Sequence, residues 1–164
     1  MMKVYLAGFM SGDQLKETTE WRQRIRSFYS GKGWDIVCLD PYNGKDVATI
    51  TGEGLKSSVT PHGIVHRDYM SVMAADVLVC NMNTFGSKRP LTGTICEMAW
   101  AWEHHKPIIM ITDDPKYTEH PFTAYFASFV YSTVEEMLKD EALDYMYKGI
   151  HSAVYDVGQI VTTG

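Results

Sequence analysis

Short apolar runs alternate with longer amphipathic stretches along most of the chain. Runs of this length, bounded by glycine, proline or aspartate, are typical of buried strands, and they predict strands over residues 3–7, 35–39, 77–80, 107–112 and 128–131. Between them, apolar residues that recur every three or four positions predict helices over residues 15–32, 66–75, 93–105 and 134–157, the last one broken near Gly149. Residues 42–61 and 81–91 follow neither pattern and are predicted to be irregular loops.

Strands that alternate with helices over crossovers of this length predict a single-domain, doubly wound α/β fold. We expect a mostly parallel five-stranded sheet with helices on both faces, of the Rossmann or flavodoxin type, built from the whole chain, residues 1–164. In such sheets the ligand binds beyond the carboxyl ends of the strands. Candidate site residues are therefore those that follow the predicted strands, in the segments 8–13, 40–45, 81–94 and 112–115.

Composition narrows the class of protein further. The 164 residues are 45% hydrophobic and 21% charged, which indicates one soluble globular domain and excludes a mainly disordered chain. No apolar run approaches the roughly 20 residues that cross a bilayer. The formal net charge of -5 argues against a nucleic acid polymer as partner, because such surfaces are normally basic.

Cysteine and histidine usage gives no indication of a metal or cofactor. The three cysteines lie far apart, and the six histidines form no HExxH pair, so no metal-ligand spacing is present. No cofactor is expected, because the segment after the first strand lacks the third glycine of a dinucleotide-binding turn. The first residues have no secretory signal pattern, and the expected compartment is a reducing cytoplasm.

The segment Thr92-Gly93-Thr94-Ile95-Cys96-Glu97 leads from a loop into a predicted helix, and two interpretations of it remain open. Thr94 and Glu97 have the spacing of a capping box, with Gly93 allowing a tight start to the helix. Alternatively, Glu97 faces the ligand crevice from the first turn. There the helix N-terminus would keep the carboxylate ionised, as a nucleophile requires.

Asp68 and Tyr5 are the other candidates for chemistry. Asp68 lies near the start of the predicted helix 66–75, where a solvated carboxylate is the favoured local interpretation. Tyr5 lies in the first predicted strand, so its hydroxyl needs a polar partner, most commonly a backbone carbonyl. Asp76 is expected to cap the turn into the third strand.

In their order and spacing, these segments resemble the nucleoside 2-deoxyribosyltransferase family. The resemblance covers roughly residues 3–112 and rests on the segments 4–8, 67–69, 74–79, 93–101 and 106–110. It implies transfer of a 2-deoxyribosyl group between nucleobases through a covalent glutamyl–sugar intermediate. The implied partners are a nucleoside or nucleotide and a free nucleobase.

The resemblance also implies a role for each candidate. Glu97 would be the nucleophile, Asp68 the acid that protonates the departing base, and Tyr5 the group that orients Glu97. Two displacements at an oxocarbenium-like centre need one ionised carboxylate and one proton donor, as in retaining glycosidases. The expected substrate-binding residues are Gly8, Phe9, Met10, Gly93 and Thr94.

One position departs from the family pattern and leaves alternatives open. Six residues before the nucleophile, transferases of free nucleosides place an aspartate and relatives that hydrolyse nucleoside 5'-monophosphates place a serine, whereas this chain has Leu91. Lys88 and Arg89, just before it, could receive a phosphate. A nucleoside 5'-monophosphate N-glycosidase and a non-catalytic nucleotide-binding module are therefore the alternatives.

The expected assembly is a homo-oligomer, a dimer or larger. Members of the family complete their pocket with a neighbour's C-terminal segment. The C-terminal segment of this chain is rich in the residue types of interface cores, namely Tyr145, Met146, Tyr147 and Tyr155.

Overall fold

The computed structural model describes residues 1–10, 15–43 and 60–151. The strands are β1 (Met2–Gly8), β2 (Ile36–Leu39), β3 (Val77–Asn81), β4 (Ile108–Ile111) and β5 (Phe129–Tyr131). The helices are α1 (Leu15–Gly31), α3 (Pro61–Ala74), α4 (Thr92–Glu103), α5 (Pro115–Thr118), α6 (Pro121–Phe126), α7 (Val134–Lys139) and α8 (Ala142–His151). None of these described helices combines the length and apolarity needed to cross a membrane.

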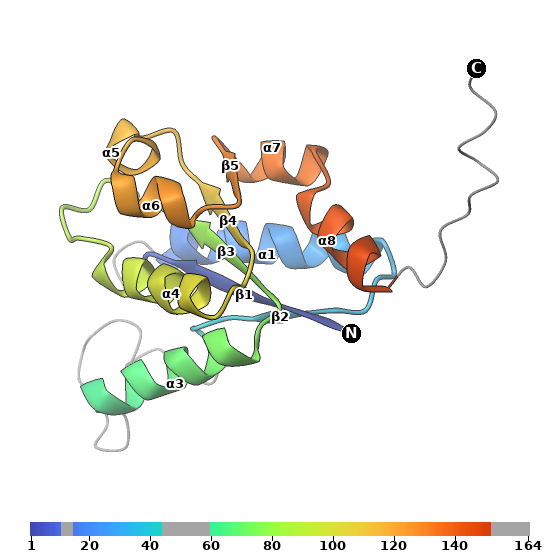
Figure 1. Cartoon of the computed structure of the whole chain (residues 1–164), viewed down its shortest axis with the longest axis horizontal. Coiled ribbons are helices and arrows are strands. Elements are labelled where there is room, and N and C mark those ends of the chain that lie inside the picture. The colour runs from blue at the N-terminus through green and yellow to red at the C-terminus, as the bar shows by residue number, and fades with distance from the viewer. Residues whose placement is uncertain (11–14, 44–59, 152–164) are drawn as a thin grey trace.

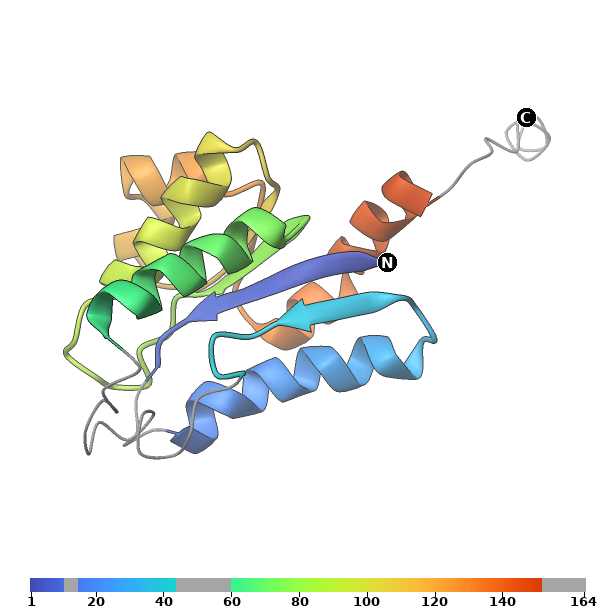
Figure 2. The same ribbon diagram turned by 90° about the horizontal axis from the view of Figure 1, so that it is seen from below.

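The five strands form one parallel sheet in the order β2-β1-β3-β4-β5 (Figure 1). The chain leaves β1 toward β2 and then returns to the other side of β1 with β3, so the strand order reverses next to β1. Helix α1 lies on one face of the sheet, and α3 and α4 lie on the opposite face (Figure 2). The predicted doubly wound α/β fold is confirmed.

Side chains that alternate along the strands feed two apolar cores, one on each face. Along β1, Val4 and Leu6 enter the core shared with α1, α7 and α8. Tyr5 and Ala7 enter the core shared with α3 and α4. Because both faces are covered, β1 and β3 are buried along almost their whole length, as parallel sheets require.

Polar side chains at two places link neighbouring strands and helices of this fold. The carboxylate of Asp76 accepts a hydrogen bond from the Lys3 amide at 2.7 Å, so this residue joins the start of β3 to β1 instead of capping the turn as predicted. The Lys106 ammonium donates to the carbonyl oxygens of Met73 at 2.8 Å and Ala75 at 2.5 Å. It therefore satisfies the end of α3, where helix carbonyls lack partners.

Helix α3 begins five residues earlier than predicted. Thr60 accepts a hydrogen bond from the Gly63 amide at 3.0 Å and Pro61 occupies the first turn, a combination that favours a helix start. Residues 44–59 of the predicted loop 42–61 lie outside the described residues. The earlier start puts Asp68 in the middle of the helix.

The C-terminal helix is interrupted earlier than predicted. Helix α7 ends at Lys139 and α8 starts at Ala142, with Glu141 at φ 55° between them. A residue with a left-handed backbone conformation ends an α-helix, and here that residue is Glu141 instead of the usual glycine. Within the described residues, α8 continues through Gly149 to His151 without the expected break, and residues 152–157 lie outside the described residues.

Candidate active site

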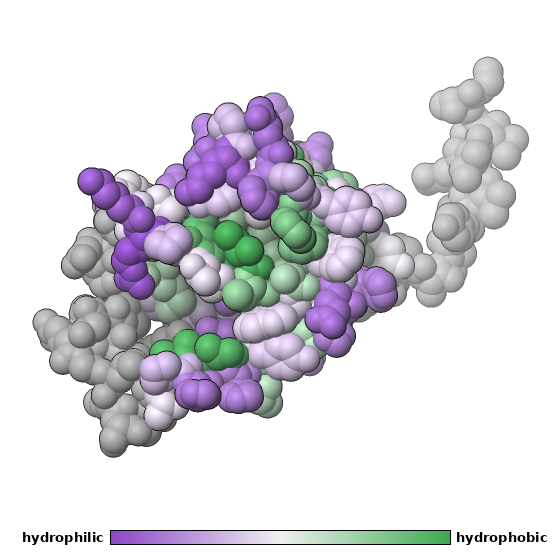
Figure 3. Space-filling view, turned by 60° about the vertical axis from the view of Figure 1, so that its left-hand side comes forward, coloured by the Kyte–Doolittle hydropathy of each residue, from purple (hydrophilic) through white to green (hydrophobic). Residues whose placement is uncertain are grey.

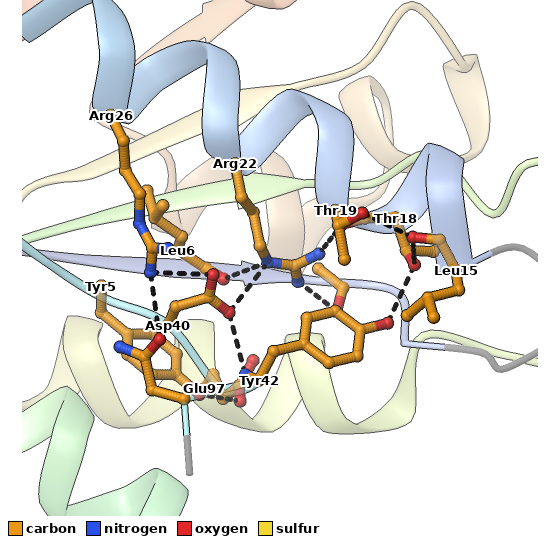
Figure 4. Close-up of polar contacts among 12 residues, drawn as sticks. Tyr5, Leu6, Leu15, Thr18, Thr19, Arg22, Arg26, Asp40, Tyr42 and Glu97 are labelled. Carbon is orange, nitrogen blue, oxygen red and sulfur yellow. Dashed lines mark hydrogen bonds and ion pairs between the residues drawn. The ribbon is translucent and has the colours of Figure 1, made fainter. Parts of the chain in front are cut away.

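Tyr5 and Glu97 meet at the face of the sheet that α3 and α4 cover. Tyr5 is fully buried in β1, and its hydroxyl donates a hydrogen bond to Oε1 of Glu97 at 2.7 Å (Figure 4). The partner of this hydroxyl is thus a carboxylate, not the backbone carbonyl that is most common. A buried hydrogen bond to a charged acceptor is short and strong, so it fixes the orientation of Glu97.

Glu97 lies one turn deeper in α4 than the sequence indicated. The helix starts at Thr92, because the Ile95 amide already donates to the Leu91 carbonyl at 2.9 Å. Leu91 is the N-cap residue and makes no side-chain capping bond. The predicted capping box of Thr94 and Glu97 is therefore wrong.

The deeper position changes the electrostatics of Glu97. It is the sixth residue of α4, whereas the influence of a helix N-terminus falls off within the first turn. The predicted stabilisation of an ionised carboxylate by this helix end is therefore weak. The Tyr5 hydroxyl is a nearer source of that stabilisation, and the carboxylate is 7% exposed.

Tyr5 stays protonated over the whole accessible pH range. Burial raises its pKa far above the ordinary tyrosine value, and the charges of Glu97 and then Asp68 raise it further. Because both carboxylates act on the same hydroxyl, the three side chains share one electrostatic environment. Tyr5 can donate a hydrogen bond there, but it cannot act as a base.

Asp68 is the eighth of the 14 residues of α3. Its side chain is half-buried, with Oδ1 shielded from solvent. The interpretation of a solvated carboxylate at a helix start is therefore wrong on both counts.

The expected substrate-binding residues occupy two neighbouring places. Gly8 ends β1 opposite Asn81, and Phe9 and Met10 follow it. A Cβ at Gly8 would lie 3.0 Å from the Asn81 carbonyl oxygen and 3.0 Å from the Trp21 ring, so only glycine fits there. Phe9 is buried beside Tyr5 in the core under α4, and Met10 is half-buried.

Gly93 and Thr94 lie in the first turn of α4. Thr94 is buried, whereas Gly93 is exposed and has no left-handed backbone. Within the described part of the chain, a Cβ at Gly93 meets nothing within 4 Å. The fold thus does not require glycine at this position for a tight start to the helix.

An open hollow of about 850 Å³ lies at the carboxyl edge of the sheet, beside the loop that precedes α4. Its described lining includes the cations Arg24, Lys88, Arg89 and Lys116 and the carboxylates Glu17, Glu20, Asp113, Asp114 and Glu135. The Arg89 guanidinium also lies 5.7 Å from the centre of the Phe9 ring. Arg89 therefore connects this hollow to the end of β1, whereas Tyr5, Asp68 and Glu97 do not line it.

Among the described residues, no group of three or more His, Cys, Asp or Glu side chains is placed to hold a metal ion. Cys80 of β3 is a thiol whose pKa is affected by Glu97. Burial raises its pKa well above the ordinary value, and the charge of Glu97 raises it further. Cys80 therefore stays a neutral core residue.

A buried arginine, Arg22, is not among the residues predicted from the sequence. The buried positions of α1 are Thr18, Trp21, Arg22, Ile25 and Tyr29. They form one helical stripe, and Arg22 is the charged residue within it. A charged residue on a stripe that is otherwise uncharged was the available indication in the sequence.

The fold and the site together define a parallel α/β protein of the class that binds a small ligand. A parallel α/β sheet whose strand order reverses beside β1 binds small ligands at its carboxyl edge. Here the face of the sheet under α3 and α4 brings two carboxylates, Glu97 and Asp68, near one protonated tyrosine, Tyr5.

The chain belongs to the nucleoside 2-deoxyribosyltransferase family, whose sequence profile matches residues 4–154. The resemblance stated above is thereby confirmed, and a deoxyribosyltransferase-type function is indicated. A solved structure of a 2-desoxiribosyltransferase from Leishmania mexicana has a similar fold, with a TM-score of 0.50 and 20% identity over 71% of this chain and 71% of that chain. A search of curated proteins gives no match.

Proposed function

We propose that this chain transfers a 2-deoxyribosyl group between nucleobases, with Glu97 as the nucleophile. The observation that carries the proposal is the buried hydrogen bond of 2.7 Å from the Tyr5 hydroxyl to Glu97. A carboxylate oriented in this way, on the helix that follows β3, meets the requirement of a displacement at a sugar carbon. Family membership supplies the class of reaction.

In the first step, a Glu97 oxygen attacks the anomeric carbon of the nucleoside. The glycosidic C–N bond breaks, its electron pair stays on the base, and Asp68 gives a proton to that base. A glutamyl ester of the sugar remains. Tyr5 keeps its proton throughout and orients the Glu97 carboxylate.

In the second step, a nitrogen of another base attacks the same carbon. The ester bond breaks, Glu97 leaves as a carboxylate, and the proton displaced from the incoming base returns to Asp68. Two displacements restore the original configuration at the sugar, as in retaining glycosidases. Water in place of the second base would give hydrolysis.

The second candidate is hydrolysis of a nucleoside 5'-monophosphate. Leu91 is 3% exposed within the core under α4, so its side chain offers no hydrogen bond to a 5'-hydroxyl. Lys88 and Arg89 lie in the same loop and line the hollow. Cations so placed favour a substrate that carries a phosphate.

Base exchange separates these candidates. The protein is incubated with 2'-deoxynucleosides and with their 5'-monophosphates, with and without free adenine, and the released and newly formed species are separated by chromatography. Exchange that requires free adenine supports the transferase. Release only from monophosphates, regardless of adenine, supports the hydrolase, and binding without turnover overturns both.

The covalent step has its own test. Without an acceptor base, the wild-type protein should gain the mass of a 2-deoxyribosyl group on the peptide that contains Glu97, and Glu97→Gln should not. Glu103→Gln is the matched control, because Glu103 is an exposed carboxylate at the end of the same helix. A mass gain in Glu97→Gln equal to that of wild type would assign the nucleophile elsewhere.

We also propose a homo-oligomer, in which exposed aromatic side chains outside the C-terminal segment take part. In that segment, Tyr145 is 73% exposed, Tyr147 stacks on Trp34 at 4.5 Å within the chain, and Tyr155 lies outside the described residues. Elsewhere on the surface, Trp102, Phe122 and Tyr125 are 45%, 63% and 74% exposed. Hydrophobic surface also gathers in the middle of the face that Figure 3 brings forward.

A second copy covering these aromatic side chains would remove them from water. Light scattering at micromolar concentration should therefore give at least a dimer. Replacing Phe122 and Tyr125 with serine should lower the molar mass that light scattering measures for the assembly. A monomeric wild-type protein with full activity would contradict this assembly.

A further inference from the structure

Strand β1 extends beyond the end of its neighbour β2. Its pairing with β2 stops at Tyr5↔Leu39, whereas its pairing with β3 continues to Gly8↔Asn81. The last residues of β1 therefore have a strand on one side only. Unpaired backbone groups inside a protein are costly and need another partner.

Arg22 of α1 is that partner. Its Nε donates to the Leu6 carbonyl oxygen at 3.2 Å, and its Nη2 donates to the Gly8 carbonyl oxygen at 3.1 Å. Nη1 donates to the Thr18 carbonyl of its own helix. The planar guanidinium thus replaces the missing part of β2 and ties the end of β1 to α1 (Figure 4).

The same guanidinium is held from the other side by the residues that follow β2. Asp40 is buried, and its Oδ1 lies 3.6 Å from Nε of Arg22. Oδ1 also accepts from the Tyr42 amide at 2.9 Å, and Oδ2 pairs with Arg26 at 3.0 Å. The rings of Trp21 and Tyr42 lie 4.4 Å and 5.1 Å from the guanidinium carbon.

We propose that Arg22 is a positioning residue of the active site, which holds the end of β1 in place. The proposal rests on the proposed function, in which Glu97 and the residues after β1 act on the substrate. Tyr5 lies directly before Leu6, and Phe9 directly after Gly8. The two anchored carbonyls therefore flank the part of β1 that connects Tyr5 to the expected substrate-binding residues.

The electrostatics agree with this geometry. Burial lowers the pKa of Arg22, and the nearby carboxylates of Asp40 and Glu97 act in the opposite direction. Arg22 and Asp40 form the buried ion pair here. Such a pair is often no more stabilising than an apolar pair of similar size, so function is a reason to retain it.

The test uses two variants, one that keeps the charge and one that removes it. Arg22→Lys keeps the charge but loses the fork that reaches both carbonyls. We expect KM for the nucleoside to rise about ten-fold with little change in kcat, faster amide hydrogen exchange at Phe9 and Met10, and an unchanged acidic limb of the pH profile.

The second variant, Arg22→Gln combined with Asp40→Asn, removes both buried charges, so that neither is left unpaired. The carbonyls of Leu6 and Gly8 then lose their donor as well, so KM and the hydrogen exchange of Phe9 and Met10 should rise at least as much as in Arg22→Lys. Arg26→Gln is the control: it contacts the same Asp40 but touches no β1 carbonyl, and its KM and pH profile should match those of wild type.

Three results would overturn the proposal. They are wild-type KM and hydrogen exchange in Arg22→Lys, wild-type KM and hydrogen exchange in the double variant, and the same KM increase in Arg26→Gln as in Arg22→Lys. If the wild-type protein releases no base from any nucleoside or monophosphate, the proposed function fails. Hydrogen exchange at Phe9 and Met10 then still decides whether Arg22 holds the end of β1.

Discussion

Replacing Tyr5 with phenylalanine removes one oxygen atom and one hydrogen bond, the bond of 2.7 Å to Glu97. The ring still fills its place in the core. A hydrogen bond to a charged group contributes about 1.5–3 kcal/mol. If this bond orients the nucleophile in the transition state, its loss should lower kcat by roughly 10- to 150-fold, since 1.4 kcal/mol is one decade.

Stability should fall as well, because Glu97 is 7% exposed and loses a donor. An unsatisfied buried group costs about 1–3 kcal/mol. In a chain of this size that lowers Tm by roughly 2–4 °C per kcal/mol. KM should change little, because Tyr5 acts on Glu97 and not on the substrate.

Tyr29→Phe is the matched control. Tyr29 is also a buried tyrosine whose hydroxyl donates to a buried carboxylate, Asp144 at 3.3 Å, but it lies in the core under α1 and α8. Both variants should lower Tm in thermal denaturation, and Tyr5→Phe alone should lower kcat for base release. A kcat within two-fold of wild type in Tyr5→Phe, or an equal loss in Tyr29→Phe, would refute the reasoning.

Three further outcomes follow from contacts described above. Lys106→Met removes the two hydrogen bonds that satisfy the end of α3; it should lower stability by about 1–3 kcal/mol in urea denaturation, and an unchanged midpoint would contradict this. Burial and the hydrogen bond to Asp140 raise the pKa of Tyr131 to about 12. Folding therefore favours the neutral form of Tyr131. The contribution of this group to the free energy of unfolding is complete below about pH 10 and is lost between about pH 10 and 12. Tm should fall more steeply over this window in wild type than in Tyr131→Phe, and parallel curves would exclude the effect. Changing Lys88 and Arg89 together to alanine should raise KM for a 5'-monophosphate about ten-fold or more and leave a free nucleoside unaffected; equal losses on both substrates would indicate a structural role for the loop.

The strands were predictable because their burial is nearly complete. Residues 77–80 and 107–112 read as continuous apolar runs, and the structure places β3 and β4 there within one residue at each end. Helix α3 was predicted five residues too short because it lies mostly on the surface. Val72 is its only fully buried residue among those described, so its early turns show no apolar periodicity.

The site was less predictable, since its pairs come from distant parts of the chain. Tyr5 and Glu97 are 92 residues apart, and only the resemblance to a family connected them. Local patterns left a cap as one of two open interpretations for Glu97 and favoured a solvated helix start for Asp68. Both interpretations failed because a helix began earlier than its sequence indicated, which moved each carboxylate deeper into its helix.

That shift changes what keeps Glu97 ready for nucleophilic attack. In the first turn of α4, the helix end itself would have stabilised the carboxylate. From the sixth position, the carboxylate relies on a hydroxyl that belongs to β1 and stays protonated because of its burial. The end of β1, in turn, is held by Arg22 where β2 no longer pairs with it. The state of the proposed nucleophile therefore depends on a side chain of β1, and less on the helix that carries it.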